Sequence, residues 1–182
     1  MNRILFLTGR PRIGKTSVLL RSINVLKALN YKVGGMVSSE IKKGEVREGF
    51  EIVNLLTNNK GWLAHVNQKT GPRVGKYRVN LNNLTHIGAD SILQAIKEAD
   101  IIVIDEIGPM ELFSTDFKDA LIKGLKCKKP VIGTIHYRIR DKLIDPLIVE
   151  ENVEILEVTY ENREKLHTTI VNNVVQYLQT TT

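Results

Sequence analysis

Residues 4–17 read Ile-Leu-Phe-Leu-Thr-Gly-Arg-Pro-Arg-Ile-Gly-Lys-Thr-Ser, an apolar strand that runs into a glycine-flanked loop and then into a helical pattern. Gly9 and Gly14 let the backbone curl so that successive N–H groups point inward at a polyphosphate, and the new helix N-terminus adds its positive dipole end. In such a loop Lys15 reaches the β- and γ-phosphates, and the Thr16 hydroxyl holds Mg²⁺. The stretch therefore predicts a phosphate-binding loop. The alternative is a glycine-rich turn that matches the pattern of such a loop by chance.

A second short apolar run, at residues 101–106, ends in the acids Asp105 and Glu106. A continuously apolar run of this length is typical of a buried central strand. At the carboxyl end of that strand Asp105 is suited to hold the Mg²⁺ shell, and Glu106 to activate a water molecule. The alternative is an acidic turn after a core strand, which would leave the metal-phosphate site without a carboxylate.

The chain has 182 residues, of which 42% are apolar, and this is enough for one hydrophobic core and one domain over 1–182. No stretch approaches the roughly 20 apolar residues that span a bilayer, and no signal-peptide pattern precedes the first strand. We therefore expect a cytoplasmic protein without membrane contact.

The sequence carries no signal for the oligomeric state, and a monomer is the expectation. A single cysteine, Cys127, excludes an internal disulfide and a cysteine-rich zinc site.

The net charge of +6 is concentrated between Glu51 and Asp90, where the sequence contains no acid. This basic segment carries five cations: Lys60, Lys69, Arg73, Lys76 and Arg78. Basic residues mixed with aromatics suit a nucleotide or a nucleic-acid strand, and a solvated sheet face fits the same pattern. Nucleic acid is therefore an open candidate partner. Trp62, Tyr77 and Tyr137 are the candidate platforms on which a nucleobase could stack.

Periodicity predicts β-strands at residues 3–7, 32–39, 46–55, 62–66, 76–81, 101–106, 131–135 and 153–158. It predicts helices at residues 15–29, 87–99 and 114–126, a short helical piece before residue 153, and a terminal helix that carries Leu166 and Tyr177, with a loop at 67–75. Strand–helix alternation at both ends of the chain predicts a parallel sheet covered by helices. In this α/β fold, residues 33–82 are expected to form an antiparallel β insertion.

Three motifs add to the phosphate loop: Val46-Arg47-Glu48-Gly49-Phe50, Gly75-Lys76-Tyr77-Arg78-Val79 and Asp105-Glu106-Ile107-Gly108-Pro109-Met110-Glu111. With them the chain resembles, over nearly its whole length, the nucleoside-triphosphatase family of thermophilic archaea and bacteria, whose animal relative is called cancer-related nucleoside triphosphatase. The third motif is the most specific, because generic P-loop proteins share only its acidic pair. Arg12 departs from the family pattern, which usually has glycine there, and Pro109 stands where lysine is common.

The resemblance implies a three-layer P-loop NTPase fold of the RecA/AAA-like division, with a mostly parallel central sheet and helices on both faces. It also implies an Mg²⁺-dependent enzyme that hydrolyses the γ-phosphate of ATP, GTP and other nucleoside triphosphates. The family's pattern places the nucleotide contacts in two segments. The first comprises Gly9, Arg10, Pro11, Arg12, Ile13, Gly14, Lys15, Thr16 and Ser17, and the second comprises Ile102, Val103, Ile104, Asp105, Glu106, Ile107, Gly108 and Pro109.

The expected reaction is in-line attack of water on the γ-phosphorus, with Glu106 as the base, Lys15 stabilising charge and Asp105 acting on the metal. Thr134, at the end of the strand at 131–135, stands where related ATPases place a polar residue that senses the γ-phosphate or positions the water. A buried strand threonine is the alternative reading of Thr134. Arg138 and Arg140 follow the same strand and are candidate arginine fingers or surface cations.

Two other functions fit the same motifs. One is a small kinase that transfers the γ-phosphate to a nucleoside or to a nucleic-acid end bound at the basic segment. The other is a nucleotide-dependent RNA-binding switch. The position of Glu106 directly after Asp105 suits water activation and so favours hydrolysis over the kinase, whereas RNA binding that changes with nucleotide would favour the switch.

Overall fold

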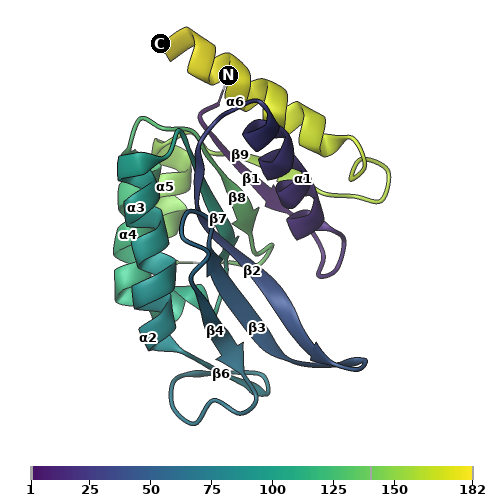
Figure 1. The fold of residues 1–182 in the computed structure, drawn as a ribbon, viewed down its shortest axis with the longest axis vertical. Coiled ribbons are helices and arrows are strands. Elements are labelled where there is room, and N and C mark those ends of the chain that lie inside the picture. The colour runs from purple at the N-terminus through teal and green to yellow at the C-terminus, as the bar shows by residue number, and fades with distance from the viewer. Residues whose placement is uncertain (1, 140, 182) are drawn as a thin grey trace.

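Within residues 2–139 and 141–181, which the computed structural model describes, the strands form one continuous sheet with helices on both faces (Figure 1). The strands are β1 (Ile4–Thr8), β2 (Val33–Lys43), β3 (Val46–Asn54), β4 (Lys60–His65), β5 (Arg73–Val74), β6 (Tyr77–Val79), β7 (Ile101–Ile107), β8 (Val131–Ile135) and β9 (Glu154–Glu157). The helices are α1 (Lys15–Ala28), α2 (Leu81–Asn83), the π-helix η1 (Leu84–Ala89), α3 (Asp90–Glu98), the 3₁₀-helix η2 (Glu111–Phe113), α4 (Thr115–Lys126), α5 (Ile144–Glu150) and α6 (Leu166–Thr181).

The strands lie in the order β5-β6-β4-β3-β2-β7-β8-β1-β9. The strands β2, β7, β8, β1 and β9 pair in parallel, whereas β3, β4, β6 and β5 continue the sheet from β2 by antiparallel pairing. The antiparallel insertion predicted at 33–82 therefore extends the central sheet, but its first strand, β2, also pairs in parallel with β7 over residues 33–36 and so belongs to the parallel part as well. Because β1, β8 and β7 are parallel neighbours, their carboxyl ends lie along one edge, where ligands bind in open α/β sheets.

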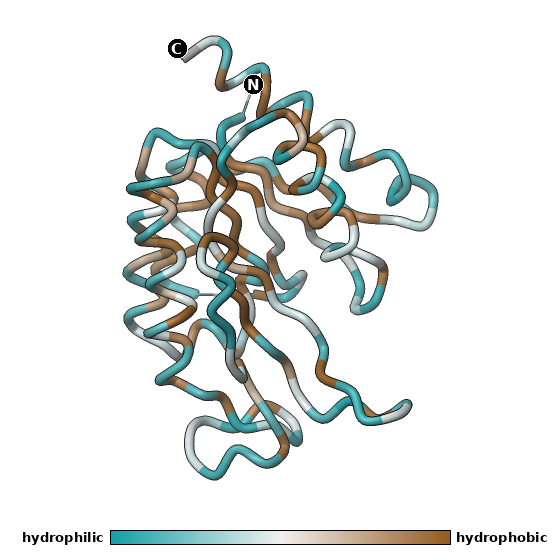
Figure 2. Tube along the Cα trace, viewed as in Figure 1, coloured by the Kyte–Doolittle hydropathy of each residue, from teal (hydrophilic) through white to brown (hydrophobic). Residues whose placement is uncertain are grey.

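Both faces of β1 are buried, which explains why its sequence does not alternate with polar residues. Ile4 and Phe6 pack on one face with the apolar residues of α3 and α4. Leu5 and Leu7 pack on the other face with those of α1 and α6. Figure 2 shows the hydrophobic positions running through the central strands and the inward sides of the helices. These two packed layers fix the start of α1, and with it the loop between Thr8 and Lys15.

The helix predicted at 87–99 begins earlier, at Leu81, so this predicted boundary is wrong. The Asn80 side chain caps the first turn, where its carbonyl oxygen accepts a hydrogen bond from the Asn83 N–H at 3.0 Å. The helical path then widens into η1 before α3 continues to Glu98. Helix α4 is also capped, because the Ser114 hydroxyl accepts a hydrogen bond from the Phe117 N–H at 3.1 Å.

The loop predicted at 67–75 is partly wrong, because it contains the two-residue strand β5 paired with β6. Gly75 lies between these strands with a positive φ of 59°, a conformation that suits a tight hairpin. A strand of two residues is too short to show a period-2 pattern, so the sequence gives no signal for it.

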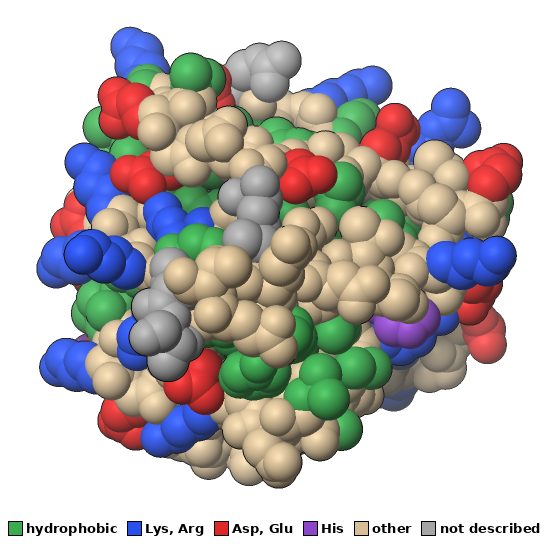
Figure 3. Space-filling model, turned by 90° about the horizontal axis from the view of Figure 1, so that it is seen from above, with side chains coloured by type: hydrophobic (Ala, Val, Ile, Leu, Met, Phe, Trp, Pro, Cys, Tyr) green, Lys and Arg blue, Asp and Glu red, His purple; other side chains and the backbone are tan. Residues whose placement is uncertain are grey.

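Helix α6 packs against α1 on one face of the sheet (Figure 1). Ile170 and Val174 lie on its buried side. On the side of the molecule seen from above in Figure 3, Lys and Arg side chains are interspersed with Asp and Glu, so neither sign of charge dominates there. Among the helices of residues 2–139 and 141–181, none combines the length and the apolar character needed to cross a bilayer.

Candidate active site

The loop between β1 and α1 follows the curled path that its sequence predicts. Gly9 and Gly14 have positive φ angles of 139° and 110°, and a Cβ atom at Gly9 would lie 2.9 Å from the Val158 carbonyl oxygen. Gly14 is the N-cap of α1, with no side-chain cap and no acid in the first turn. The helix N-terminus therefore presents N–H donors and positive potential without a capping side chain, which is the chemistry that binds a phosphate.

Arg12 also lies in the left-handed region, with a φ of 64°. A residue with a Cβ atom pays a conformational penalty of about 1 kcal/mol there that glycine avoids. The Arg12 side chain itself is exposed, so it contributes positive charge at the loop surface.

The Lys15 ammonium group lies across the loop. Its Nζ atom donates to the carbonyl oxygens of Gly9 and Arg10, at 3.2 Å and 3.5 Å. Because it extends from the first residue of α1 back over the loop, the ammonium group reaches the space that the loop encloses. This position is consistent with the predicted contact between Lys15 and the terminal phosphates.

Asp105 is buried at the carboxyl end of β7 and is held by groups from three neighbouring elements. The Thr134 hydroxyl of β8 donates to Asp105 Oδ1 at 2.6 Å, and the Thr16 hydroxyl of α1 lies 3.3 Å from Oδ2. Burial raises the pKa of the Asp105 carboxyl, and hydrogen bonds from Thr134, from the Ser38 N–H and from Thr16 oppose that rise. Thr16 and Asp105, each predicted to act on Mg²⁺, therefore lie together in the fold.

The oxygens of Thr16 and Asp105 are hard ligands of the kind that Mg²⁺ takes. Within residues 2–139 and 141–181, no group of three or more His, Cys, Asp and Glu side chains is placed to hold a metal ion. A cation at this position would therefore complete its shell with water and phosphate oxygens, as Mg²⁺ does in phosphate-transfer sites. The residues present fit Mg²⁺ bound together with a polyphosphate, and not a metal held by protein ligands alone.

Glu106 follows Asp105 directly and is mostly buried. Burial raises its pKa to about 7; the nearby Lys15 charge opposes this rise and the Asp105 charge adds to it. A carboxylate with a pKa near neutrality combines a large ionised fraction with enough basicity to take a proton. Glu106 is thus electrostatically suited to the predicted role of a base.

Glu111, in η2, is a second buried acid beside Glu106. Burial and the Glu106 charge raise its pKa to about 8. Gly108 separates the two carboxyl groups, since a Cβ atom there would lie 2.9 Å from Glu106 Oε1 and 3.0 Å from Glu111 Oε2. The sequence marks Glu111 only as part of the Asp105–Glu111 motif, and its approach to Glu106 depends on the turn at Gly108.

A cavity of about 220 Å³ adjoins Glu106. Its remaining walls come from the β insertion, from the turn after β7 and from the end of β8: Ser38, Phe50, Leu63, Val74, Pro109, Met110, Glu111 and His136. These residues are mainly apolar and include no Lys or Arg. A larger cavity, of about 360 Å³, lies within the insertion and shares no residue with the site.

The site residues predicted in and after β8 differ in what the structure shows of them. Thr134 is fully buried and touches Asp105, so the structure supports both readings of it, a buried strand residue and a part of the site. Arg138 is exposed, with its guanidinium group 5.0 Å from the centre of the Tyr137 ring. Arg140 lies outside the described residues. The role of Arg138 as an arginine finger stays a prediction.

Two of the aromatic platforms predicted for the nucleobase are wrong. Tyr77 is only 7% exposed, and its hydroxyl accepts a hydrogen bond from Arg47 Nε at 2.9 Å. Trp62 is on β4, which β3, β2, β7 and β8 separate from β1. At about 4.8 Å per strand this is about 24 Å across the sheet. The Trp62 ring stacks on His65 at 3.9 Å. Neither residue is placed to hold a base whose phosphates lie in the loop.

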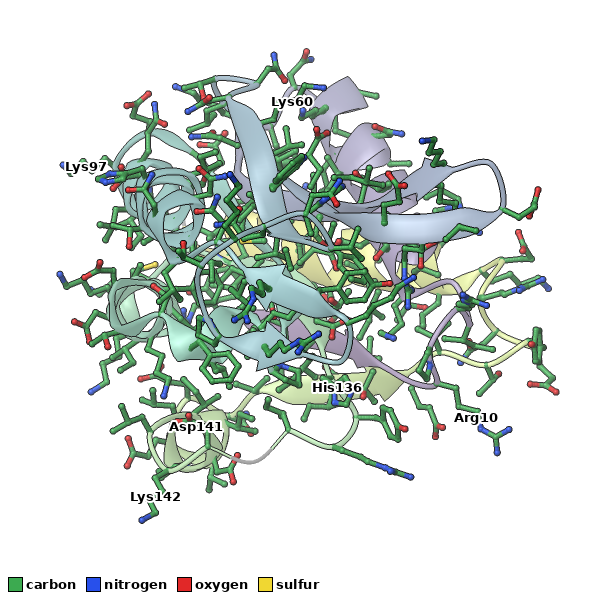
Figure 4. The ribbon with its side chains drawn as sticks, turned by 90° about the horizontal axis from the view of Figure 1, so that it is seen from below. Arg10, Lys60, Lys97, His136, Asp141 and Lys142 are labelled. Carbon is green, nitrogen blue, oxygen red and sulfur yellow. The ribbon has the colours of Figure 1, made fainter. Side chains whose placement is uncertain are left out.

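The basic segment lies on the same distant part of the sheet. In Figure 4, Lys60 lies far from Arg10 of the loop and from His136 at the end of β8. The Lys60 ammonium is 3.6 Å from Glu51 Oε1, and Arg78 Nη1 donates to the Gly71 carbonyl at 3.0 Å. These cations are partly engaged within the insertion, which favours the predicted alternative of a solvated sheet face.

The first strand of the parallel sheet leads through a glycine-flanked loop into a helix. An aspartate two strands away meets the threonine of that helix. Together these two features define a P-loop protein. The chain matches the family model described as NTPase over residues 4–171. It therefore belongs to the NTPase family, as the sequence motifs indicate.

Curated relatives and solved structures agree with this assignment. A nucleoside-triphosphatase THEP1 from Thermofilum pendens is 44% identical over 161 residues, 88% of each chain. One from Methanocaldococcus jannaschii is 40% identical, over 96% of this chain and 99% of the relative. The crystal structure of THEP1 from Aquifex aeolicus matches with a TM-score of 0.79 at 26% identity, over 94% of this chain and 98% of that one. A human cancer-related nucleoside triphosphatase matches with a TM-score of 0.78 at 32% identity, over 94% and 97%. The predicted α/β P-loop fold is confirmed, with a sheet that combines parallel and antiparallel strands.

Proposed function

We propose that the protein is an Mg²⁺-dependent nucleoside-triphosphatase that hydrolyses ATP, GTP and other nucleoside triphosphates by attack of water on the γ-phosphorus. One observation carries the proposal: the Thr16 hydroxyl and the Asp105 carboxylate meet at 3.3 Å beside the phosphate loop, and Glu106 is the next residue. The names of the relatives from T. pendens and M. jannaschii, nucleoside-triphosphatase THEP1, support the same activity.

The triphosphate is held first. The N–H groups of the loop and of the α1 N-terminus bind the phosphate oxygens, and Lys15 neutralises charge on the β- and γ-phosphates. Thr16 and Asp105 would hold Mg²⁺, and the bound cation would supply positive charge that stabilises the leaving diphosphate. Thr134 positions Asp105 through its 2.6 Å hydrogen bond.

The water is activated next. Glu106 accepts a proton from the water as the new oxygen–phosphorus bond forms, and the bond between the γ-phosphorus and the bridging oxygen breaks. Burial, which raises the Glu106 pKa to about 7, makes it a stronger base than an exposed glutamate. Lys15 and the loop N–H groups stabilise the charge on the transferred phosphoryl group.

The test is phosphate release from ATP, GTP, CTP and UTP, with Mg²⁺ and with a chelator, by wild type and Glu106→Gln. We expect the variant to bind nucleotide normally and to lose about 10² or more in turnover. Glu45→Gln, on the exposed hairpin between β2 and β3, is the matched control and should leave turnover unchanged. Normal turnover by Glu106→Gln would exclude Glu106 as the base.

The cavity beside Glu106 favours a second candidate function, transfer of the γ-phosphate to a small hydroxyl compound. Its volume of about 220 Å³ far exceeds the ~30 Å³ that one water takes in the liquid. Among the described residues its walls carry no Lys or Arg, so they suit a neutral acceptor and not a nucleic-acid end. In this reaction the acceptor hydroxyl gives its proton to Glu106, its oxygen bonds to the γ-phosphorus, and the nucleoside diphosphate leaves.

Product analysis separates the two functions. Glycerol and thymidine, as neutral hydroxyl probes, are added to the enzyme with Mg²⁺ and ATP, and ADP and inorganic phosphate are quantified together. Equal yields of ADP and phosphate indicate hydrolysis alone. An excess of ADP over phosphate, matched by phosphorylated probe, would establish the transferase.

A further inference from the structure

The two ends of a nucleoside triphosphate in this site face different neighbours of β1. Asp105 and Glu106 are on β7 and Thr134 is on β8, so the γ-phosphate end points to the β8 side of the loop. On its other side β1 pairs with β9, with Thr8 in register with Glu157. Because the phosphates form a linear chain, the α-phosphate and the nucleoside leave the loop toward β9 and the segment that follows it.

That following segment, residues 158–165, lies directly against the loop. The Val158 N–H donates to the Thr8 carbonyl at 2.9 Å. The Arg163 Cδ atom is 3.8 Å from the position of a Cβ atom on Gly14. Arg21 of α1 forms an ion pair with Glu164 at 2.7 Å, which joins the end of the segment to the helix. The segment therefore forms the wall of the loop on the nucleoside side.

Tyr160 and Arg163 are the flat side chains of this wall. The Tyr160 side chain is 71% exposed, and the Arg163 guanidinium lies 5.0 Å from the centre of its ring. An exposed tyrosine ring beside an arginine plane provides a surface on which a purine or pyrimidine can stack. Arg163 also lies 3.6 Å from Glu164, which helps to orient its guanidinium group along the segment.

The polar side chains nearest the pair are already engaged within the segment. The Asn162 amide accepts from the Thr159 N–H at 2.8 Å and donates to the Glu157 carbonyl at 2.8 Å. The Thr159 hydroxyl accepts from the Asn162 N–H at 3.3 Å. These groups hold the turn in shape, so they do not read the hydrogen-bonding edge of a base.

We propose that Tyr160 and Arg163 form the nucleobase platform of this site, and that they bind all four bases by stacking without reading base edges. The inference rests on the proposed function, because the position of the base follows from the triphosphate in the loop. It assigns base binding to a segment whose sequence carries no nucleotide motif. It also gives a structural reason for hydrolysis of several different nucleoside triphosphates.

The test compares dissociation constants of ATP, GTP, CTP, UTP and inorganic tripolyphosphate, each with Mg²⁺, for wild type, Tyr160→Ala and Tyr160→Phe. Loss of one stacking partner weakens binding by about tenfold. We expect this loss for every nucleotide with Tyr160→Ala, near wild-type binding with Tyr160→Phe, and unchanged tripolyphosphate binding in both. The ligand without a base thus controls for damage to the loop itself.

Unchanged nucleotide affinity in Tyr160→Ala would overturn the platform, and so would an equal loss for tripolyphosphate. A loss confined to one base would overturn base-independent stacking. Each of these results leaves the proposed hydrolysis intact, because wild type would still bind and cleave the triphosphate. If wild type bound neither ATP nor tripolyphosphate, the proposed function would fail together with the platform.

Discussion

Replacing Thr134 by valine removes a single hydroxyl group from the centre of the site. Valine has nearly the volume and shape of threonine, so the substitution opens no cavity in β8. What is lost is the 2.6 Å hydrogen bond from the Thr134 hydroxyl to Asp105 Oδ1, inside a region where both side chains are buried. Thr134→Val therefore measures how much this one bond contributes to holding the carboxylate.

The expected loss in stability follows from the charge of the acceptor. A hydrogen bond to a charged group contributes about 1.5–3 kcal/mol, and for a domain of this size 1 kcal/mol corresponds to about 2–4 °C in Tm. Thr134→Val should therefore lower Tm by about 3–12 °C. Because the hydroxyl favours the ionised carboxylate, whose pKa burial raises, the loss should grow as pH rises. Residues that orient metal-binding groups typically contribute about 10–100-fold to activity, so turnover should fall by that factor.

The assay is calorimetric unfolding at several pH values together with Mg²⁺-dependent phosphate release. Thr134→Ser, which keeps the donor and loses only a methyl group, is the matched control and should retain most of the activity. If Thr134→Val equalled wild type in both Tm and turnover, the hydroxyl would be a passive strand group and the reasoning would be refuted.

Two further predictions concern stability. Burial raises the pKa values of Glu106 and Glu111 from 4.5 to about 7 and about 8. The folded metal-free protein thus keeps protons that the unfolded chain has released, and its stability should fall as pH rises from about 5 to 8. When the free energy of unfolding is measured with urea at several pH values, Glu111→Gln should lose less stability between pH 5 and 8 than wild type does. An equal loss of stability in both proteins would contradict the prediction. A Cβ atom at Gly35 would lie 2.0 Å from the Val103 carbonyl oxygen, whereas Gly44, also at positive φ, has open space around it. Gly35→Ala should therefore cost about 3 kcal/mol or more and Gly44→Ala about 1 kcal/mol; equal losses would contradict the close approach.

The central part of the fold could be predicted because its signals are local. The loop of residues 9–16 and the run at 101–106 each combine a buried strand with chemistry at its end. The contact between Thr134 and Asp105 could not be predicted, because it lies where the parallel pairing of β7 with β8 shifts register, between Ile104 and Ile107.

The missed features have different causes. The helix start at Leu81 has a local signal, the capping residue Asn80, which the predicted start at residue 87 overlooks. Strand β5 has only two residues, too few to show a pattern. Tyr160 and Arg163 carry no motif, and only the pairing of β9 with β1 brings their segment to the loop. Tyr77 was a candidate platform on composition alone, and its burial beside Arg47 follows from the packing of the β insertion.

The most direct test of the central claim is to run hydrolysis of ATP by wild type in heavy-oxygen water, with Mg²⁺, and to locate the label by mass spectrometry. Attack of water on the γ-phosphorus predicts one labelled oxygen in the inorganic phosphate and none in the ADP. Label in the ADP would contradict the account, because water would then have attacked a different phosphorus atom. Absence of turnover in the presence of Mg²⁺ would contradict it as well.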